Sequence, residues 1–253
     1  MNHNTDPEKF EFISTRREGH VLWIGFNRPK ERNAFNTQMV LELSEAYTLL
    51  ENDPELRCGV VYAEGKQFTL GLDLPDVSAT LREHQRLPLR DGALDPWGMA
   101  GPTRTTPLII AAHGMVITLG IELMLAADIR ICAKRSTFGQ IEVTRGIVPF
   151  GGATTRLPQQ CGWGNAMRYI LTGDAFDADE AYRIGLVQEV VEKSELLEKA
   201  GELARKVADQ APLATRGAVE IARIAAQQTA DEAQKYVLKK AIALMDTEDA
   251  AEG

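Results

Sequence analysis

Apolar positions along the chain predict an alternation of short strands and amphipathic helices. Helical spacing of three and four residues follows Asn36, whose side chain suits an N-cap, and ends near Asp53. The segment 75–107 is irregular in composition, which favours a loop that covers a site, and its His84 and Trp97 are assigned no role. Short apolar runs that favour strands cover residues 21–26, 58–63, 108–112 and 186–191.

Beyond residue 194 the apolar periodicity is helical throughout, with interruptions at Pro212 and Asp231. This change of pattern predicts a boundary near residue 195. We expect an α/β core over residues 1–195 and a helical subdomain over residues 196–253, whose leftover apolar faces suit contacts between subunits.

One glutamate lies within an almost wholly apolar helix. Residues 119–127 are apolar except for Gly120 and Glu122, so no face of this helix is polar enough to meet water. Burying an unpaired carboxylate is costly, and Glu122 therefore needs a partner or a function.

A second glutamate, Glu142, follows between Ile141 and Val143. Burial raises the pKa of a carboxyl, and two carboxyls in one pocket move apart in pKa, which gives an acid and a base near neutrality. Glu122 and Glu142 are therefore a candidate acid/base pair. The alternative is that Glu122 pairs with a basic residue and Glu142 is a solvated charge at a strand end.

Two loops have compositions that suit ligand binding. Arg28, Lys30 and Arg32 follow the first apolar run and could bind phosphate, although solvated loop charge is the commoner case. Gly71 would let the backbone approach a ligand closely, which leaves the amide of Leu70 as a candidate hydrogen-bond donor.

Composition narrows the class of protein. The 253 residues are 44 % hydrophobic, enough for a sizeable core, and carry 28 basic and 36 acidic side chains for a net charge of −8. This balance argues against nucleic acid or an anionic membrane as the main partner. Cys58, Cys132 and Cys161 are too far apart for a metal motif and fit a reducing compartment. Because residues 1–9 are polar and no long apolar run follows, we expect a cytoplasmic protein.

Several segments together resemble the enoyl-CoA hydratase/isomerase (crotonase) family over nearly the whole chain. The matching residues are 27–29, 32–36, 68–74, 120–123, 127–128, 138–142, 151–152, 156–158 and 178–187. Their order and spacing are specific to the superfamily and much less specific to one reaction. The resemblance implies an α/β fold, a crotonase-like spiral of ββα units, with a C-terminal helical region that forms a homotrimer or homohexamer.

The resemblance also implies a chemistry. The ligand would be an acyl-CoA thioester, with no metal or redox cofactor. The backbone N–H groups of Leu70 and Leu119 would form an oxyanion hole for the thioester enolate. Glu122 would activate the water added at Cβ, and Glu142 would give the proton to Cα. The substrate-binding positions implied in the same way are Arg28, Lys30, Arg32, Ala34, Phe68, Gly71, Leu72, Asp73 and Gly120.

The chain departs from the family pattern at the implied oxyanion hole. Family members commonly have a small residue where Leu70 stands and a glycine run at positions 118–120, here Thr-Leu-Gly. The side chains of Leu70 and Leu119 would crowd the acyl pocket, which predicts an acyl group of unusual shape.

Three functions stay open from the sequence. The chain could be an enoyl-CoA hydratase, or an isomerase or C–C hydrolase in which Glu142 alone moves a proton. A catalytically silent CoA-binding or RNA-binding homologue is the third, with the RNA version least favoured by the acidic balance.

Overall fold

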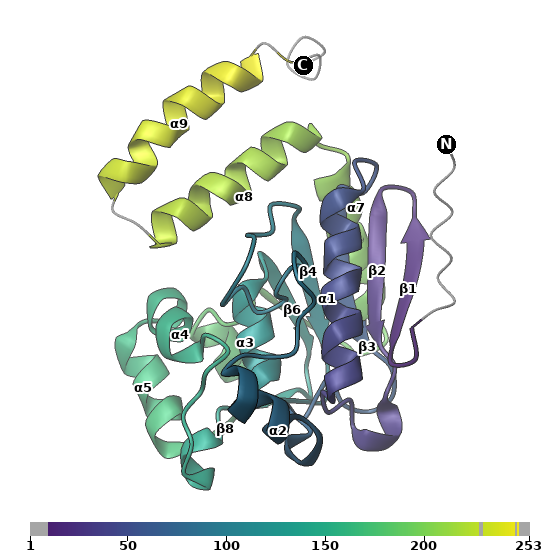
Figure 1. Ribbon diagram of the computed structural model, residues 1–253, viewed down its shortest axis with the longest axis vertical. Helices are drawn as coiled ribbons and strands as arrows, with labels where there is room; N and C mark the ends of the chain where they lie inside the picture. The colour runs from purple at the N-terminus through teal and green to yellow at the C-terminus, as the bar shows by residue number, and fades with distance from the viewer. Residues whose placement is uncertain (1–9, 228–229, 246, 248–253) are drawn as a thin grey trace.

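The computed structural model describes residues 10–227, 230–245 and 247; the polar start, residues 1–9, lies outside them. The strands are β1 (Ile13–Glu18), β2 (Val21–Phe26), β3 (Cys58–Ala63), β4 (Leu108–Ala112), β5 (Met115–Ile117), β6 (Ile129–Ala133), β7 (Thr137–Gly139), β8 (Ala175–Asp177) and β9 (Glu189–Val191). The α-helices are α1 (Thr37–Asn52), α2 (Leu74–His84), α3 (Leu119–Ala126), α4 (Ala153–Cys161), α5 (Trp163–Thr172), α6 (Ala178–Arg183), α7 (Leu196–Ala208), α8 (Pro212–Gln227) and α9 (Ala230–Met245), and η2 (Pro29–Glu31) and η3 (Glu142–Arg145) are 3-10 turns. Figure 1 shows their arrangement.

The strands form two sheets between which the chain alternates. A six-stranded sheet has the order β1-β2-β3-β4-β6-β9, and a three-stranded sheet has the order β5-β7-β8. Strand β4 of the first sheet is followed by β5 of the second and then by α3, and β6 is likewise followed by β7 and then by η3 and α4. This repetition is the ββα succession that the resemblance predicts.

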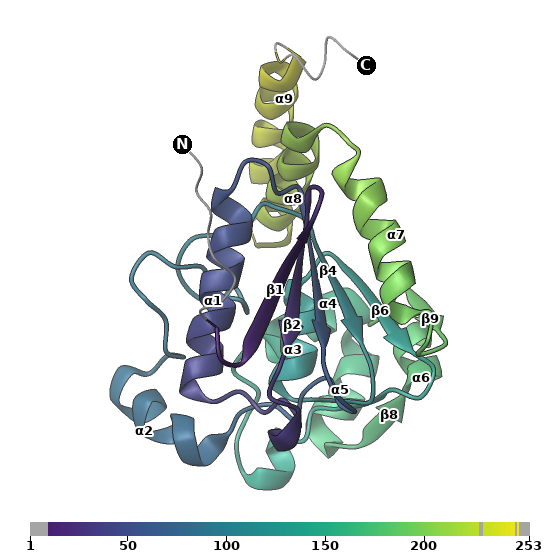
Figure 2. The ribbon, with the colours of Figure 1, turned by 90° about the vertical axis from the view of Figure 1, so that its right-hand side faces the viewer.

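Helices cover both faces of the six-stranded sheet, which explains why β2 and β4 are buried along their whole length. Helix α1 lies on one face and α7 on the other (Figure 2). The small residues Ala200 and Ala204 of α7 pack with Trp23 in the second of two core clusters. The other cluster lies between the sheet, α1 and α3.

The predicted first helix is confirmed, whereas the prediction of a loop from residue 75 is wrong for its first ten residues. The side chain of Asn36 accepts the Met39 N–H at 2.9 Å and caps α1. Helix α2 forms where a loop was expected because Pro75 falls in its first turn, where a missing N–H costs nothing, and Val77 anchors it in the interior.

The predicted strand over residues 186–191 forms only at its end. The N–H groups of Leu186 and Val187 donate to the Ala181 carbonyl, so these residues close α6 instead of pairing with a strand. Pairing with β6 begins at Glu189. The strand is thus shorter than predicted because its first two amides bond to the end of α6.

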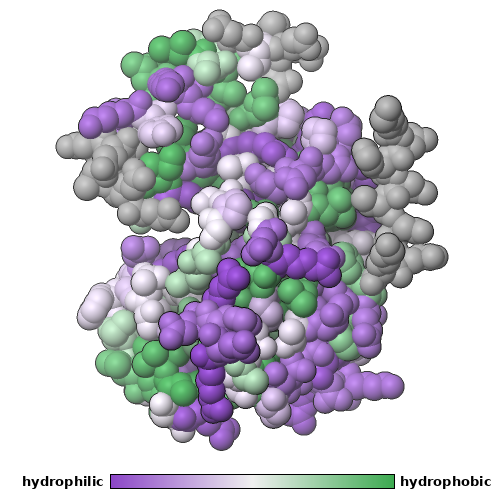
Figure 3. Space-filling model, in the orientation of Figure 1, coloured by the Kyte–Doolittle hydropathy of each residue, from purple (hydrophilic) through white to green (hydrophobic). Residues whose placement is uncertain are grey.

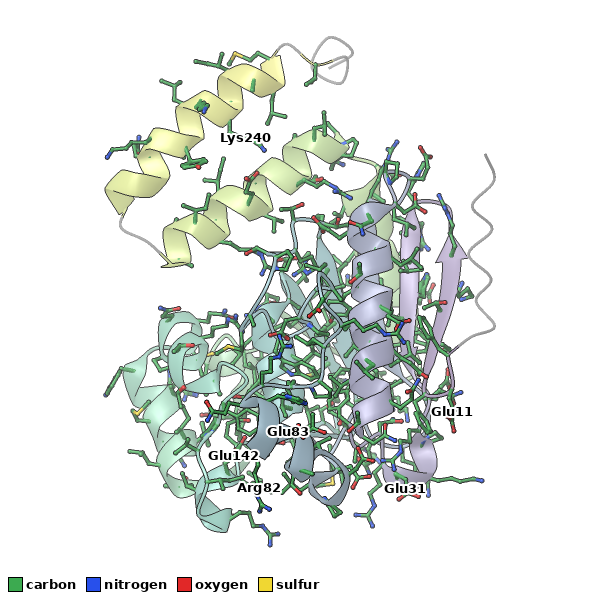
Figure 4. The ribbon with its side chains drawn as sticks, in the orientation of Figure 1. Glu11, Glu31, Arg82, Glu83, Glu142 and Lys240 are labelled. Atoms are coloured by element: carbon green, nitrogen blue, oxygen red, sulfur yellow. The ribbon has the colours of Figure 1, made fainter. Side chains whose placement is uncertain are left out.

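The helices after residue 195 divide between two positions. Helix α7 packs on the sheet, whereas α8 and α9 form an antiparallel hairpin that projects from the body (Figure 1). Within the hairpin, Lys240 of α9 reaches toward α8, where its Nζ pairs with Glu220 at 2.7 Å (Figure 4). Arg223 ties α8 to the body through Asp128 at 2.9 Å. As a domain division, the boundary near residue 195 stays a prediction.

Arg104 is the buried cation of the joint where α8 meets the body. Its side chain is 5 % exposed and donates to the carbonyl oxygens of Thr106 and Ala126 and, at 2.7 Å, to Asp128. Asp128 accepts the Leu108 N–H as well, so one guanidinium orders the entry of β4 and the end of α3.

Arg104→Met is expected to lower the free energy of unfolding by about 3 kcal/mol, because it leaves the Thr106 carbonyl without this donor and removes one of the two cations paired with Asp128. Urea unfolding measures the change. Arg90→Met is the matched control: Arg90 pairs with Glu45 at 2.7 Å but is 66 % exposed, so its loss should cost less than about 1 kcal/mol. Equal effects of the two substitutions would contradict this account of the joint.

Candidate active site

Glu122 lies in the first turn of α3, and the apolar helix buries it as predicted, with 1 % exposed. Its Oε1 accepts the N–H groups of Gly151 at 2.8 Å and Ala153 at 3.0 Å. Its Oε2 accepts no hydrogen bond from the described residues. Glu122 makes no ion pair with them either, so the alternative of a basic partner in direct contact is wrong. Two backbone amides therefore fix Oε1, whereas Oε2 is left without a hydrogen bond from the described residues.

The surroundings of Glu122 act on its pKa in opposite directions. Burial raises the pKa and dominates, while the amides of Ala153 and Gly151 and the charge of Arg156 oppose it. The resulting pKa lies above the ordinary value for a glutamate, so this carboxyl keeps its proton up to a higher pH than usual.

Glu142 is buried at the start of η3 with 5 % exposed, and not a solvated charge at a strand end. Its Oε2 is buried without a hydrogen-bond partner among the described residues, and its Oε1 lies 3.5 Å from Gln140 Nε2. Burial, with a smaller contribution from the nearby charge of Glu122, raises the pKa of Glu142 to about 7. Figure 4 places Glu142 in the lower half of the body, far from α9. The two glutamates are thus electrostatically coupled, as the sequence predicts.

Glu42 shows what a structural buried carboxylate looks like in this chain. It is 2 % exposed, and its two oxygens accept the N–H groups of Glu11, Phe12 and Ile13 at 2.7 to 3.0 Å. Every oxygen of Glu42 is used, whereas Glu122 and Glu142 each keep one that is not. An unsatisfied buried carboxylate oxygen is costly, and such groups concentrate at sites of chemistry.

The predicted donors Leu70 and Leu119 lie on neighbouring segments. Thr69 forms a parallel bridge with Val116, and the Ile117 N–H donates to the Thr69 carbonyl at 3.1 Å. Leu119 is the first residue of α3, so its N–H points out of the helix. Neither amide donates to an acceptor among the described residues. The structure therefore brings together two free N–H groups beside Glu122.

Glycines allow these two segments to approach. A Cβ on Gly120 would stand 2.6 Å from Thr69 Cγ2, and one on Gly71 would stand 1.9 Å from Thr118 Oγ1. Gly71 also has a φ of +85°, which side chains disfavour. The predicted neighbours Phe68 and Leu72 belong to the same segment, which β-bridges Phe35 at Leu72 and is buried at Phe68.

The basic loop divides into a fixed part and an exposed part. Arg28 pairs with Asp73 at 2.9 Å and donates to the Ala34 carbonyl at 2.9 Å, so these three predicted residues hold one another. Lys30 and Arg32 are exposed and form no ion pair within the described residues. Only these two cations of the loop are free to meet a phosphate.

Asn33 is a residue whose role the sequence did not reveal. It is fully buried, accepts the Arg28 N–H at 2.9 Å, and donates to the carbonyls of Glu64 and Gln67. Its own carbonyl accepts the Thr69 hydroxyl at 2.6 Å. Asn33 therefore fixes the basic loop to the segment that carries the Leu70 amide.

Trp97 is the second such residue, since no sequence pattern indicated a role for it. Its indole N–H donates to the Leu119 carbonyl at 3.0 Å, and its own carbonyl accepts from Arg156 at 2.6 Å. Asp95 accepts the Trp97 N–H at 2.9 Å, a turn for which an Asp two residues upstream is the only local signal. This loop therefore packs against the start of α3.

A cavity of about 470 Å³ opens beside the turn that holds Glu122. Gly151, which donates to Glu122, lines it, so one wall of the cavity is the turn that holds the carboxylate. Most of the remaining wall is apolar, from α2, the following loop and Phe150. Its lining residues are Leu81, Gln85, Arg86, Leu87, Leu89, Asp95, Met99, Ala100, Phe150 and Gly151.

Two absences among the described residues bear on the class of site. Within the ranges 10–227 and 230–245, no three His, Cys, Asp or Glu side chains are grouped as metal ligands would be. The helices of the same ranges are all too short or too polar to span a bilayer.

Comparison with known proteins gives one consistent result. The profile of the enoyl-CoA hydratase/isomerase family matches residues 16–253. A carnitinyl-CoA dehydratase of Salmonella typhi is 34 % identical over 252 residues, which cover 96 % of this chain and 94 % of the relative.

Solved structures agree with the sequence comparison. A probable enoyl-CoA hydratase/isomerase from Mycobacterium abscessus superposes with a TM-score of 0.93 at 46 % identity, covering 96 % of this chain and 93 % of that one. An enoyl-CoA hydratase from Mycobacterium tuberculosis H37Rv superposes with a TM-score of 0.86 at 31 % identity and the same coverage. The predicted crotonase-like α/β fold is confirmed, and the chain belongs to the enoyl-CoA hydratase/isomerase family.

Proposed function

We propose that the chain is an enoyl-CoA hydratase, which adds water across the 2,3 double bond of an acyl-CoA thioester. The observation that carries this proposal is the meeting of two coupled glutamates, each with a free oxygen, and two free backbone N–H groups. The family includes both hydratases and isomerases, and a relative named as a dehydratase favours the exchange of water.

Each group has a part in the proposed addition. The thioester oxygen gains negative charge when water attacks Cβ, and the amides of Leu70 and Leu119 stabilise that enolate. The free Oε2 of Glu122 takes a proton from the attacking water, while the amides on Oε1 keep the carboxylate oriented. Glu142 gives its proton to Cα, for which a pKa of about 7 suits it.

The cavity beside Glu122 is the proposed site of the acyl chain. At about 470 Å³ it lies within the range of small-molecule sites and exceeds what a four-carbon acyl group fills. Its apolar wall favours a long, branched or cyclic acyl group, consistent with the unusual shape predicted from Leu70 and Leu119. Efficient turnover of both crotonyl-CoA and decenoyl-CoA would count against that shape.

The basic loop is the proposed site of the CoA phosphates. Lys30 and Arg32 are exposed and unpaired within the described residues, so they supply charge, whereas Arg28 shapes the loop through Asp73 and Ala34. We propose that the basic loop, the two amides and the cavity bind the phosphates, the thioester and the acyl chain respectively.

Self-association and location are proposed on separate grounds. Apolar side chains stand exposed on α5 and α9, including Trp163 at 72 % and Leu238 at 67 %. A hydrophobic patch over α5 and a second over the hairpin are visible in Figure 3. Patches of this kind suit the homotrimer or homohexamer implied by the resemblance.

Three buried free thiols suit a cytoplasmic protein. The carboxylates and amides supply the proposed chemistry without a metal or redox cofactor.

Product mass decides between the proposed reaction and its alternatives. The panel consists of crotonyl-, decenoyl-, branched and aryl-substituted 2-enoyl-CoA thioesters. Hydration adds the mass of one water, isomerisation leaves the mass unchanged, and C–C hydrolysis releases a fragment. Binding of the whole panel without any change of mass would replace the hydratase by a silent CoA-binding homologue.

The kcat/KM for hydration is expected to follow a bell-shaped pH profile. The active form of the two glutamates holds one proton, which lies on Glu142. Because the pKa of Glu142 is about 7, the free enzyme loses this proton above pH 7, and kcat/KM falls about tenfold per pH unit. On the acid side Glu122, whose pKa is also raised, gains the second proton. Initial rates between about pH 5 and 9 test this; a profile flat over that range would contradict it.

A further inference from the structure

Thr118 has a backbone conformation that a β-branched residue rarely adopts. Its φ is 51° and its ψ is −114°, outside the regions allowed for side-chain-bearing residues. Two anchors keep it there, since its N–H donates to the Gly139 carbonyl at 2.9 Å and its carbonyl accepts the N–H groups of Ile121 and Glu122. Glycine would adopt the same backbone without strain, so the side chain is retained at a cost.

The strained residue directs one of the two free amides. The Leu119 N–H belongs to the peptide group that follows Thr118, so the ψ of Thr118 sets the direction in which that N–H points. The side chain of Thr118 lies between this amide and the segment of the other, because its Oγ1 contacts Gly71, the residue after Leu70.

The Thr118 hydroxyl has no use within the protein. It neither donates to nor accepts from any described residue, and Thr118 is only half-buried. It is not among the enclosed polar atoms that lack a partner, so it keeps access to solvent. The Thr69 hydroxyl, by contrast, donates to the Asn33 carbonyl at 2.6 Å.

We infer that the Thr118 hydroxyl is a third hydrogen-bond donor to the thioester oxygen, beside the amides of Leu70 and Leu119. This inference rests on the proposed function, which puts the thioester between those amides. A donor aimed at an oxygen that gains charge strengthens its bond as the enolate forms, and so raises kcat more than it lowers KM.

Three substitutions separate the hydroxyl from the shape and from the strain. Thr118→Val keeps the branched shape and loses the hydroxyl, Thr118→Ser keeps the hydroxyl, and Thr118→Gly removes both the strain and the hydroxyl. We expect Val and Gly to lower kcat by about 10- to 100-fold with KM changed by less than about threefold, and Ser to stay within about threefold of the wild type. If the Thr118→Val variant does not fold, the test is the comparison of kcat between the Thr118→Gly and Thr118→Ser variants.

A spectroscopic readout tests the same bond without turnover. The ultraviolet absorbance of bound cinnamoyl-CoA shifts to longer wavelength as its carbonyl is polarised. The shift should be equal in the wild type and the Ser variant and smaller in the Val and Gly variants.

Equal shifts in all four proteins, or a Val variant as active as the wild type, would overturn the inference. If the wild type hydrates its substrate but the absorbance shift is the same in all Thr118 variants, the inference fails and the proposed function stands. If no thioester is hydrated but the shift depends on the hydroxyl, the inference stands and the proposed reaction fails.

Discussion

Glu142→Gln is expected to lower kcat for hydration by about 10² to 10⁴-fold while the protein remains folded. The amide keeps the size of the side chain but holds no proton that it can give to Cα at neutral pH. Because Glu142 Oε2 has no partner among the described residues, the substitution breaks no hydrogen bond at that atom. The loss should therefore appear in kcat with little change in the free energy of unfolding.

Two measurements check this expectation. Steady-state kinetics gives kcat and KM, and exchange of the Cα proton of the product thioester with deuterated solvent reports the proton transfer by itself. Glu42→Gln is the matched control at a buried glutamate outside the site; it should lower stability, because Glu42 accepts three backbone N–H groups, with little effect on kcat. Rapid Cα exchange in Glu142→Gln would assign the proton transfer to another group.

Gly71→Ala is expected to lower kcat by about 10² to 10³-fold, the effect of losing one oxyanion donor. The added Cβ would stand 1.9 Å from Thr118 Oγ1 and 3.3 Å from the Ile117 carbonyl oxygen, at a φ of +85°. The segment must then move away from α3 and carry the Leu70 amide with it. Affinity for CoA itself should stay unchanged, since the basic loop is held by Asn33 and Arg28.

Gly19→Ala is the control for backbone strain alone. Gly19 also has a positive φ, of +58°, but a Cβ there would meet nothing within 4 Å. It should cost about 1 kcal/mol of stability and leave kcat unchanged. A fully active Gly71→Ala enzyme would show that the Leu70 amide does not need its present position.

The burial of the two glutamates could be predicted from the sequence because it depends on local composition. Glu122 is flanked on both sides by apolar residues in one helix, and any packing of that helix desolvates it. The apolar neighbours Ile141 and Val143 predict the burial of Glu142, whereas its η3 turn could not be predicted from them. What holds Glu122 could not be predicted, since the Gly151 amide comes from a turn beyond two strands.

The proposed oxyanion hole is only partly predictable from residue patterns. Gly71 alone indicates the Leu70 amide, and only the family resemblance indicates the Leu119 amide. The Leu70 segment is positioned by the pairing of residue 69 with residue 116, a tertiary contact, and the Leu119 amide is free because it begins α3. The strain at Thr118 is likewise invisible in the sequence, although its departure from the glycine run was visible.

Loops were predicted least well, for a physical reason. Helix α2 was missed because proline-rich composition in 75–107 outweighed the helical spacing of its apolar residues. Trp97 received no role because its partner, the Leu119 carbonyl, lies in another element. A side chain whose function is to position another segment has no local pattern to reveal it.

Glu122 and Glu142 are proposed to add water to an enoyl thioester together. The most direct test is a mass-resolved assay in heavy-oxygen water of the wild type, Glu122→Gln and Glu142→Gln, with the 2-enoyl-CoA substrate that the panel selects. We expect the wild type to incorporate one heavy oxygen at Cβ and each substitution to lower the rate of incorporation by at least about 100-fold. Unchanged incorporation in either variant, or none in the wild type, would contradict it.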